Sequence, residues 1–298
     1  MIKKYLIYPA EAIALSLLLL IFWLPGLAVG SWLGGMFGRF IGPLFGITGI
    51  ARQQIRLAFP DWADDKVDPT VRDMWENVGR TLAEYPHLYK FKRKFQSNEI
   101  PIEGKEILEN MRDKNKQAIF FSAHLGNWEL SLLLGQRYDL DLISIYRAPN
   151  NPWVDWILKK CRQEVVGDLL TKGPQGARGV VQAAKTGRNI ALLIDQKMND
   201  GIPVPFFGRD AMTAPAIAQV ALKNNLWLVP VHVVRERGVE FRIVVEKPFK
   251  LKNTKNKKAD IHAAMVRLNK YIEGWVTQHP SQWFWLHKRW PKKTAEKK

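Results

Sequence analysis

An uncharged segment near the amino terminus limits what this chain can fold into, because it is long enough to cross a lipid bilayer. Residues 12–38 contain no acidic or basic side chain across 27 positions, and residues 15–24 are almost continuously apolar. A membrane-spanning helix needs about 20 apolar residues, and indoles such as those of Trp23 and Trp32 favour the headgroup boundary. We therefore expect residues 1–45 to form a membrane anchor with a juxtamembrane segment, and residues 46–298 to form one folded domain.

Two other interpretations of this segment remain open. A cleaved signal peptide is compatible with Lys3 and Lys4 ahead of the apolar run and with the small residues 28–30, but the run exceeds the usual core of about 7–15 residues. A buried helix is the second, and Pro25 together with the glycines of residues 30–46 would interrupt it. Basic residues flank the segment on both sides, so charge alone does not give its orientation.

Short apolar runs alternate with helix-compatible segments through the rest of the chain. Several runs are rich in Ile, Val and Phe, as strands buried on both faces are, and three helical segments begin with proline, which suits a first helical position. This alternation predicts an α/β fold with a mainly parallel mixed sheet flanked by helices. The last two runs, joined through residues 235–238, are typical of a hairpin at a sheet edge. The expected strands are residues 117–123, 140–146, 189–194, 226–234 and 239–246, and the expected helices are residues 70–89, 152–164, 174–186, 215–225 and 260–278.

The composition points to an anionic partner. There are 45 Lys and Arg residues against 28 Asp and Glu, a formal net charge of +17. Acidic lipid headgroups, a phosphorylated substrate, an acidic carrier protein or nucleic acid would each fit this excess. We expect no nucleic-acid partner, because the chain has no RNA-binding or helix-turn-helix signature. The single cysteine, Cys161, excludes an intrachain disulfide and any metal site built from several cysteines.

The candidate chemistry lies where the first of these predicted strands ends. The segment His124-Leu-Gly-Asn-Trp-Glu129 follows that strand, and parallel α/β sheets bind ligands at the carboxyl ends of their strands. Gly126 permits a tight turn that would place Glu129 in the first helical turn, facing the imidazole. The carboxylate would then fix the proton on one ring nitrogen and leave the other nitrogen to take a hydroxyl proton. The alternative is that His124 and Glu129 only cap the loop and the helix.

Two other site classes do not match this sequence. The spacing is not His-Glu-x-x-His and no third ligand stands out, so we expect no metal. The chain also has no Gly-x-Ser-x-Gly motif, which argues against a serine hydrolase of that type.

Three later segments belong with the His124 segment: Tyr146-Arg147-Ala-Pro-Asn-Asn151-Pro152, Ile194-Asp195-Gln196 followed by Val204-Pro-Phe-Phe-Gly208, and Trp283-Phe-Trp-Leu-His-Lys-Arg-Trp290. Together these four blocks resemble the bacterial lipid A late acyltransferases, a family within the His-x4-Asp/Glu glycerolipid acyltransferases. His-x4-Glu alone is a weak signal, but four blocks in family order are specific, and with the apolar amino terminus the resemblance covers most of the chain.

The resemblance implies a reaction for residues 46–298 as an acyltransferase domain. An acyl chain carried by acyl carrier protein would pass to a hydroxyl of a lipid A precursor, in lipopolysaccharide biosynthesis. His124 would act as general base and Glu129 would orient it. Transfer would be direct, without an acyl-enzyme, because Cys161 lies in a predicted helix; no cofactor is implied.

Four further residues are expected to bind substrate. Arg147 follows a strand and would hold a phosphate or the developing oxyanion with its planar guanidinium. Asp195 ends a strand on the same sheet edge as His124 and would order Arg147 or Arg289. Arg289 would hold an acceptor phosphate or, beside Trp283, Trp285 and Trp290, lie at the membrane interface. Asn151 belongs to the Asn-Pro part of its block and is assigned to substrate binding by resemblance.

The implied partners explain the basic charge. They are the acidic acyl carrier protein thioester, a phosphorylated glycolipid acceptor and the anionic inner membrane, with the catalytic domain facing the cytoplasm and a monomer as the default state. One alternative is acylation of another glycolipid or a lysophospholipid, with coenzyme A as the donor carrier. A remote alternative is a non-catalytic membrane-anchored protein that binds anionic lipid or nucleic acid through charge.

Overall fold

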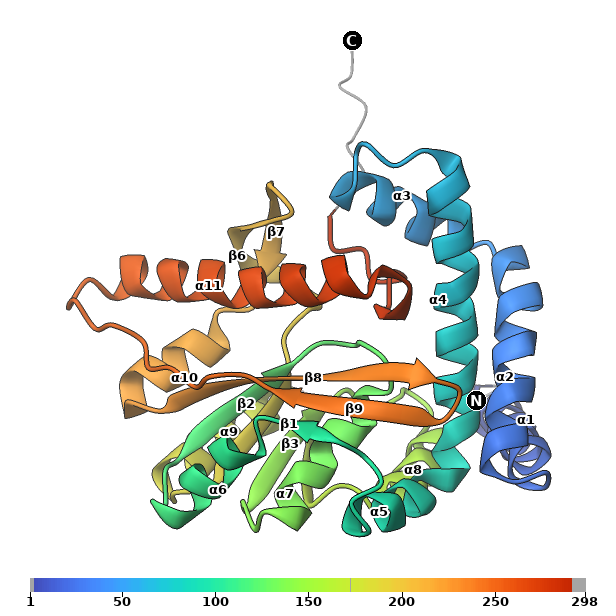
Figure 1. Cartoon of the computed structure of the whole chain (residues 1–298), viewed down its shortest axis with the longest axis horizontal. Helices are drawn as coiled ribbons and strands as arrows, with labels where there is room; N and C mark the ends of the chain where they lie inside the picture. Colours follow the sequence, from blue (N-terminus) through green and yellow to red (C-terminus); the bar gives the residue numbers. More distant parts are fainter. Residues whose placement is uncertain (1–2, 172, 291–298) are drawn as a thin grey trace.

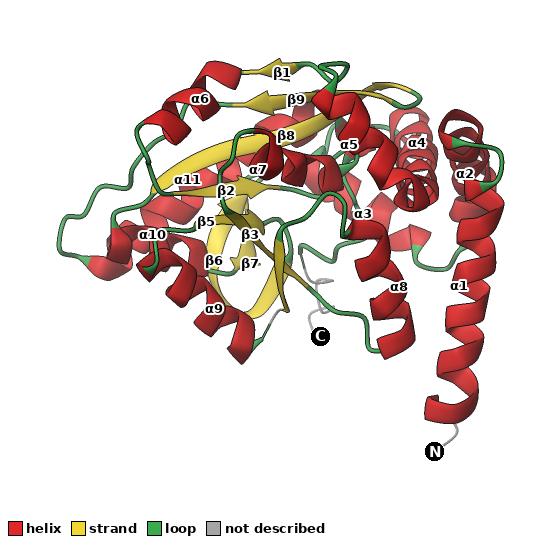
Figure 2. Cartoon of the chain, turned by 90° about the horizontal axis from the view of Figure 1, so that it is seen from below, coloured by secondary structure: helices red, strands yellow, loops and turns green. Residues whose placement is uncertain are grey.

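The computed structural model describes residues 3–171 and 173–290, which form a sheet covered by helices on both faces (Figures 1 and 2). The helices are η1 (Lys3–Ile7), α1 (Tyr8–Trp23), α2 (Leu27–Ile41), η2 (Gly42–Leu44), α3 (Thr48–Ala58), α4 (Asp64–Glu84), η3 (Tyr85–His87), α5 (Leu88–Gln96), α6 (Lys105–Asp113), η4 (Trp128–Leu132), α7 (Leu133–Arg137), α8 (Pro152–Arg162), α9 (Pro174–Lys185), α10 (Ala216–Asn224), α11 (Lys257–Gln278) and η5 (Pro280–Gln282). The strands are β1 (Ile102–Glu103), β2 (Ala118–Ser122), β3 (Leu142–Tyr146), β4 (Asp168–Thr171), β5 (Asn189–Leu193), β6 (Lys197–Phe206), β7 (Arg209–Thr213), β8 (Trp227–Arg237) and β9 (Glu240–Val245).

The main sheet has seven strands in the order β1-β9-β8-β2-β5-β3-β4. All neighbouring pairs are parallel except β8 and β9, which form an antiparallel hairpin. The expected α/β class and mainly parallel mixed sheet are therefore confirmed. The hairpin was expected at the sheet edge, and this is wrong, because the short strand β1 pairs with β9 and takes the edge.

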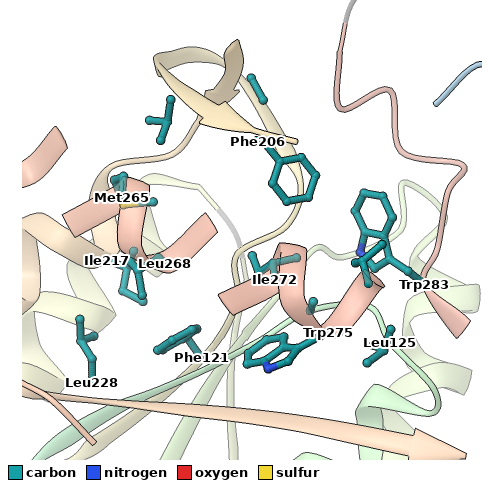
Figure 3. Close-up of a cluster of buried hydrophobic side chains, with 14 of the residues drawn as sticks. Phe121, Leu125, Phe206, Ile217, Leu228, Met265, Leu268, Ile272, Trp275 and Trp283 are labelled. Carbon is teal, nitrogen blue, oxygen red and sulfur yellow. The ribbon is translucent and has the colours of Figure 1, made fainter. Parts of the chain in front are cut away.

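Side chains of the central strands enter two cores. In β2, Ile119 and Phe121 belong to the cluster beneath α9, α10 and α11, whereas Phe120 belongs to the cluster beneath α5, α6 and α7. Figure 3 shows the first core, in which Phe121 lies below Leu268 and beside Trp275 of α11. Alternate side chains of a strand point to opposite faces, so a strand covered on both sides reads as the continuous apolar run seen in the sequence.

The predicted strands over residues 117–123, 140–146, 189–194, 226–234 and 239–246 are all present, with small changes in their ends. Four predicted helices are also present, as α8, α9, α10 and α11. The helix predicted over residues 70–89 instead spans Asp64–Glu84 and is followed by the 3-10 turn η3 at Tyr85–His87, since Pro86 has no amide hydrogen to donate to the α-helical ladder. The sequence did not reveal the two-stranded sheet of β6 and β7, whose turn has positive φ at Phe207 and Gly208.

The amino-terminal apolar segment forms two helices instead of one. Pro25 lies in the turn between α1 and α2. The glycines expected to interrupt a buried helix instead lie within α2, where they let its backbone approach α4. A Cβ placed on Gly79 of α4 would lie 2.1 Å from the carbonyl oxygen of Gly34, and one on Gly38 would lie 2.1 Å from that of Trp75.

By length and composition, Lys4–Trp23 is the one helix of the described residues that could cross a membrane, and the bent pair Leu27–Leu44 with Thr48–Ala58, at 89°, could count as a second. It is therefore a candidate membrane anchor. The division at residue 45 into anchor and catalytic domain stays a prediction. The basic residues 292–298 lie outside the described residues.

The contact between α2 and α4 makes Gly79→Ala a destabilising change. The added methyl group would meet helix backbone, which cannot move aside, so overpacking should outweigh the gain in helix propensity. We expect a loss of about 1–3 kcal/mol, measured as a lower thermal midpoint of the protein in detergent. Gly274→Ala in α11 is the matched control, since nothing lies within 4 Å of its added Cβ, and it should keep or raise the midpoint. A Gly79→Ala midpoint at or above that of the wild type would contradict this packing.

Candidate active site

Two neighbouring parallel strands place the candidate catalytic groups together. Ser122 at the end of β2 pairs with Leu193 at the end of β5, and His124 and Asp195 each follow two residues later. After β2 the chain enters α7 on one face of the sheet, and after β5 it proceeds to α10 on the other. Neighbouring strands with connections to opposite faces leave a crevice at their carboxyl ends. The expectation that Asp195 shares a sheet edge with His124 is confirmed.

Asp195 holds His124 by its main chain and by its ring. The Asp195 carboxylate accepts hydrogen bonds from the His124 amide, at 2.8 Å, and through its other oxygen from His124 Nδ1, at 2.8 Å. Trp283 Nε1 donates a third, also at 2.8 Å. Asp195 is fully buried, which works to raise its pKa, but the attraction and the two hydrogen bonds of His124 outweigh burial and hold the pKa of Asp195 well below its usual range. The carboxylate is thus ionised at neutral pH and leaves His124 Nε2 as the nitrogen that can accept a proton.

Glu129 does not orient His124 in this structure, contrary to the sequence expectation. Its carboxylate accepts hydrogen bonds from Tyr85 Oη at 2.7 Å, from Arg162 Nε at 2.9 Å and from Trp128 Nε1 at 3.2 Å. As predicted, Glu129 lies in the first turn of a helix, but this helix is the 3-10 turn η4 and the side chain is directed to α8 and η3. Asp195 occupies the orienting position that was expected for Glu129.

The Glu129 carboxylate forms a buried ion pair with Arg162 of α8. Burial disfavours the charged guanidinium, but the charge of Glu129 and the contacts with Tyr85 outweigh it and raise the pKa of Arg162. Burial also raises the pKa of Tyr85 well above its ordinary value, so its hydroxyl stays protonated and can donate to Glu129. Arg162 therefore keeps its positive charge at neutral pH.

The loop between His124 and Glu129 is fixed by main-chain contacts. Gly126 has φ +57°, and a Cβ there would lie 2.5 Å from the carbonyl oxygen of Val233, so the tight turn expected at this glycine is confirmed. The Gly126 carbonyl accepts hydrogen bonds from Asn77 Nδ2 and Thr81 Oγ1 of α4, and its amide donates to Gln282.

A second buried ion pair connects this loop to α2. Glu84 at the end of α4 pairs with Arg235 of β8. The Glu84 carboxylate also accepts hydrogen bonds from Asn127 of the loop, at 2.8 Å, and from Ser31 of α2, at 2.7 Å. One carboxylate therefore links the apolar amino-terminal helices to the segment that carries His124.

A largely apolar cavity of about 390 Å³ adjoins His124. It opens where β3 and β5 part: they pair only over Leu142–Ser144 and Asn189–Ala191, after which β5 stays with β2. His124, Glu129 and Arg162 contribute to its wall. Its apolar wall includes Phe120, Leu132, Leu134, Leu140, Leu142, Ile145, Leu169, Leu192, Leu193, Ile194, Ile217 and Val231.

Two other predicted substrate-binding residues, Arg147 and Asn151, lie in different surroundings. Arg147 is exposed, lines the cavity and has no hydrogen-bond or ion-pair partner within residues 3–171 and 173–290, so its role stays a prediction. Asn151 is not part of the cavity wall: its side chain caps α8 and donates to Tyr8 O and to Glu11 of α1.

The phosphate-binding role expected for Arg289 does not fit this structure. Arg289 is fully buried and donates to the carbonyl oxygens of Gln196 and Met212 and to the side chains of Thr213 and Asn269. Burial lowers its pKa to about 10. The expected membrane-interface position is also wrong, because Trp283, Trp285 and Trp290 are buried in the core. The expectation that Asp195 orders Arg147 or Arg289 is wrong as well, since its partners are His124 and Trp283.

His287 is a third polar group at this site and was not singled out from the sequence. Its Nε2 lies 4.0 Å from Asp195, and burial lowers its pKa to about 4, so it is neutral at pH 7. Ligand atoms of His124, Asp195 and His287 all lie within 4.8 Å of one another, a geometry that could also hold a metal ion, so the statement that no third ligand stands out is wrong. In this structure, however, His124 Nδ1 is hydrogen-bonded directly to Asp195, as is typical of an imidazole–carboxylate pair.

Local sequence did not reveal Arg162 or Tyr85 as partners of Glu129. Both lie on helices remote in sequence, and neither stands in a motif of its own. For Asp195 a signal was present, because it ends a strand parallel to the one before His124.

Comparison with known proteins shows the family of this chain. The family model described as bacterial lipid A biosynthesis acyltransferase matches residues 3–292. The chain belongs to this family. It is 23% identical to lipid A biosynthesis acyltransferase 2 of Shigella flexneri over 84% of this chain and 80% of that one. It is also 24% identical to the lipid A biosynthesis myristoyltransferase of Escherichia coli K12, over 84% and 77%, and 22% identical to the lauroyltransferase of the same organism, over 80% and 78%. The protein is therefore an O-acyltransferase.

Removing the negative charge of Asp195 should abolish most of the acyl transfer. In Asp195→Asn the amide cannot accept from both His124 Nδ1 and Trp283 without presenting a donor to one of them, so the wrong imidazole tautomer is favoured. We expect turnover to fall by about 10³–10⁴-fold, the scale of the equivalent change in serine proteases, while the thermal unfolding curve still shows a folded protein. Asp200→Asn, at an exposed position of β6, is the control; a loss below tenfold in Asp195→Asn would contradict the assignment.

Arg162→Met should destabilise the protein because it leaves Glu129 buried without its counter-charge. A cost of about 3–5 kcal/mol is typical when one partner of a buried pair is lost, and the double variant Glu129→Gln/Arg162→Met should recover most of it. Chemical denaturation measures the free energy of unfolding of the single and the double variant. Arg188→Met, which breaks the contacts of Arg188 with the exposed carboxylates of Asp141 and Asp168, should cost less than about 1 kcal/mol. Equal losses for Arg162→Met and Arg188→Met would show that the Glu129 pair is not effectively buried.

Proposed function

We propose that this acyltransferase moves a fatty acyl chain from acyl carrier protein to a hydroxyl of a lipid A precursor. The observation that carries the proposal is the hydrogen bond between His124 and Asp195, together with the apolar cavity that His124 lines. An apolar cavity suits a fatty acyl chain, and a histidine with one nitrogen fixed by a carboxylate suits removal of a hydroxyl proton. The curated relatives act in lipid A biosynthesis according to their names.

The proposed reaction proceeds through one tetrahedral intermediate. The acceptor oxygen attacks the thioester carbonyl carbon while His124 Nε2 takes the hydroxyl proton, which forms the new C–O bond. Asp195 stabilises the resulting imidazolium through Nδ1–H. Collapse of the intermediate breaks the C–S bond, and the imidazolium returns the proton to the departing thiolate.

Transfer without an acyl-enzyme is supported by the surroundings of His124. Ser122, Ser131 and Ser144 line the cavity, and within the described residues none of them is hydrogen-bonded to the imidazole; the hydroxyls of Ser122 and Ser131 donate to the carbonyl oxygens of Ala123 and Trp128. Burial raises the pKa of the Cys161 thiol, which disfavours the nucleophilic thiolate, and Cys161 does not line the cavity. A covalent mechanism would need a nucleophile hydrogen-bonded to the base.

The two arginines of the cavity wall receive different roles in this proposal. Arg162, held by Glu129, provides a positive charge near the reacting carbonyl and favours the oxyanion. Arg147 is exposed at the same cavity and is suited to an acceptor phosphate. Glu129 then acts through Arg162 instead of through His124.

The net charge supports anionic substrates and an anionic membrane. A charge of +17 favours an acidic carrier protein, a phosphorylated glycolipid and the cytoplasmic leaflet of the inner membrane. The second candidate is acylation of a different glycolipid or a lysophospholipid with an acyl-coenzyme A donor. Arg147 and the cavity fit this acceptor and this donor equally well, so the identity of the acceptor lipid distinguishes the two candidate functions.

A transfer assay in detergent tests the proposal. Purified protein would be incubated with a tetra-acylated lipid A precursor carrying its two acidic sugars, together with a series of acyl carrier protein thioesters of different chain length, and products would be followed by mass spectrometry. We expect a mass gain of one acyl chain, abolished in His124→Ala. Cys161→Ser should retain the activity because the thiol does not take part.

His262→Ala provides the control for the histidine, since His262 is exposed on α11 away from the cavity. Near-native transfer by folded His124→Ala would refute the base assignment. If folded protein gives no product with any acyl carrier protein thioester but does acylate another lipid from acyl-coenzyme A, the second candidate function replaces the first.

A further inference from the structure

Both apolar helices are packed lengthwise against the catalytic body. The inward side of α1 is a stripe at helical spacing, Ala12, Leu15, Leu19 and Phe22, of which Ala12, Leu19 and Phe22 are buried. The amino-terminal end of α1 is held by Asn151, whose Nδ2 donates to Tyr8 O and to Glu11, both at 2.8 Å. The opposite end contacts His87, whose Nε2 lies 3.1 Å from Phe22 O. Contacts at both ends hold α1 along the body and not away from it.

The second helix lies against a highly charged helix over its whole length. Gly30, Gly34 and Gly38 of α2 face inward, the last two directly onto α4. Over this length α4 carries five charged residues, and α2 itself carries Arg39, which pairs with Asp73 and Glu76. These charged residues are Arg72, Asp73, Glu76, Arg80 and Glu84. Charged side chains are strongly disfavoured in the middle of a bilayer, so α2 cannot cross the membrane unless α4 enters it as well.

The outer sides of the two helices are apolar and aromatic. On α1, Ile13 is 61% exposed and Leu24, at its end, 67%; on α2, Val29 is 49% and Phe40 68% exposed. The remaining exposed apolar side chains on this surface are Leu17, Leu18, Leu20, Ile21, Trp23, Trp32, Leu33, Phe37 and Ile41. In both views α1 and α2 form the same side of the molecule (Figures 1 and 2).

Basic groups and further indoles border this surface. Lys90, Arg93 and Lys94 of α5 line a hollow together with Leu27 and Ala28 at the start of α2. The exposed indoles of Trp153 and Trp156 lie on α8, which packs against α1. Aromatic and apolar side chains bordered by cations are typical of elements that lie in the boundary of an anionic leaflet.

We propose that α1 and α2 both lie along the surface of an anionic lipid leaflet as a monotopic anchor, so that neither helix crosses the membrane and the amino terminus stays on the side of the catalytic domain. The length and composition of α1 alone would allow a crossing; its contacts with Asn151 and His87, at opposite ends of the helix, oppose it. The proposal does not depend on which lipid is acylated.

Depth measurement in vesicles distinguishes the two arrangements. In a Cys161→Ser background, Ile13→Cys and Leu24→Cys sample α1, and Val29→Cys and Phe40→Cys sample α2. Each pair is eleven residues apart on the exposed side, which corresponds to about 16 Å along a helix. Each cysteine would carry an environment-sensitive fluorophore, quenched by lipids spin-labelled at different depths in vesicles of phosphatidylethanolamine and phosphatidylglycerol.

We expect both members of each pair to lie at the same shallow depth, within a few ångströms, and Lys252→Cys on the catalytic domain to be unquenched. A difference in depth of about 16 Å within either pair would overturn the proposal, and so would failure of the protein to bind the vesicles.

Sidedness gives a second, independent test. A cleavable peptide tag ahead of residue 1 should resist protease in intact spheroplasts and be cut in inverted membrane vesicles. A tag at the carboxyl terminus should behave in the same way in both preparations. Cleavage of the amino-terminal tag from the outer side of intact spheroplasts would establish a crossing helix and overturn the proposal. Neither readout involves acyl transfer, so failure here is distinguishable from failure of the proposed reaction.

Discussion

The geometry of the site depends on the buried carboxylate of Asp195. Because it binds both the amide and the ring of His124, it fixes where the residue lies and how the imidazole is turned. A buried charge is unfavourable unless it is fully hydrogen-bonded, and the third contact, from Trp283, brings the carboxyl-terminal segment into the site. The two strands that carry His124 and Asp195 must therefore be neighbours, and the order of the sheet provides this by inserting β5 between β2 and β3.

A second buried carboxylate, that of Glu84, connects α2 with the loop that carries His124. It joins Arg235 of the sheet, Asn127 of the loop and Ser31 of α2 in one buried network. The glycine contacts between α2 and α4 bring Ser31 close enough to take part. As a result, the loop that carries His124 rests on the sheet, on α4 and on one of the two apolar helices, and α2 is a structural part of the catalytic body.

The sequence was informative where a single physical requirement decides the outcome. Strands covered on both faces must be apolar, so residues 117–123 and 189–194 could be located, and Gly126 could be assigned to a turn that only glycine accommodates. It was uninformative where partners come from distant segments. The five-residue spacing suggested that Glu129 faces His124, but a 3-10 turn directs it to Arg162 and Tyr85. Arg289 resembled a phosphate ligand by type, yet its burial and its four oxygen acceptors are set by tertiary packing. The glycines of α2 looked like helix breakers because the sequence did not show that this segment packs closely against α4.

The position of Asn151 has a kinetic consequence. It stands four residues after Arg147, which lines the cavity, and it holds the first turn of α1. The part of the cavity wall that contains the exposed Arg147 is therefore connected to α1, one of the two helices proposed to contact lipid. With α1 lying in the leaflet, enzyme and acceptor lipid search for each other in two dimensions, and the acceptor does not have to leave the bilayer completely to reach His124. Turnover would then follow the mole fraction of acceptor in the surface, and inert lipid added at constant total acceptor would slow the enzyme by dilution alone.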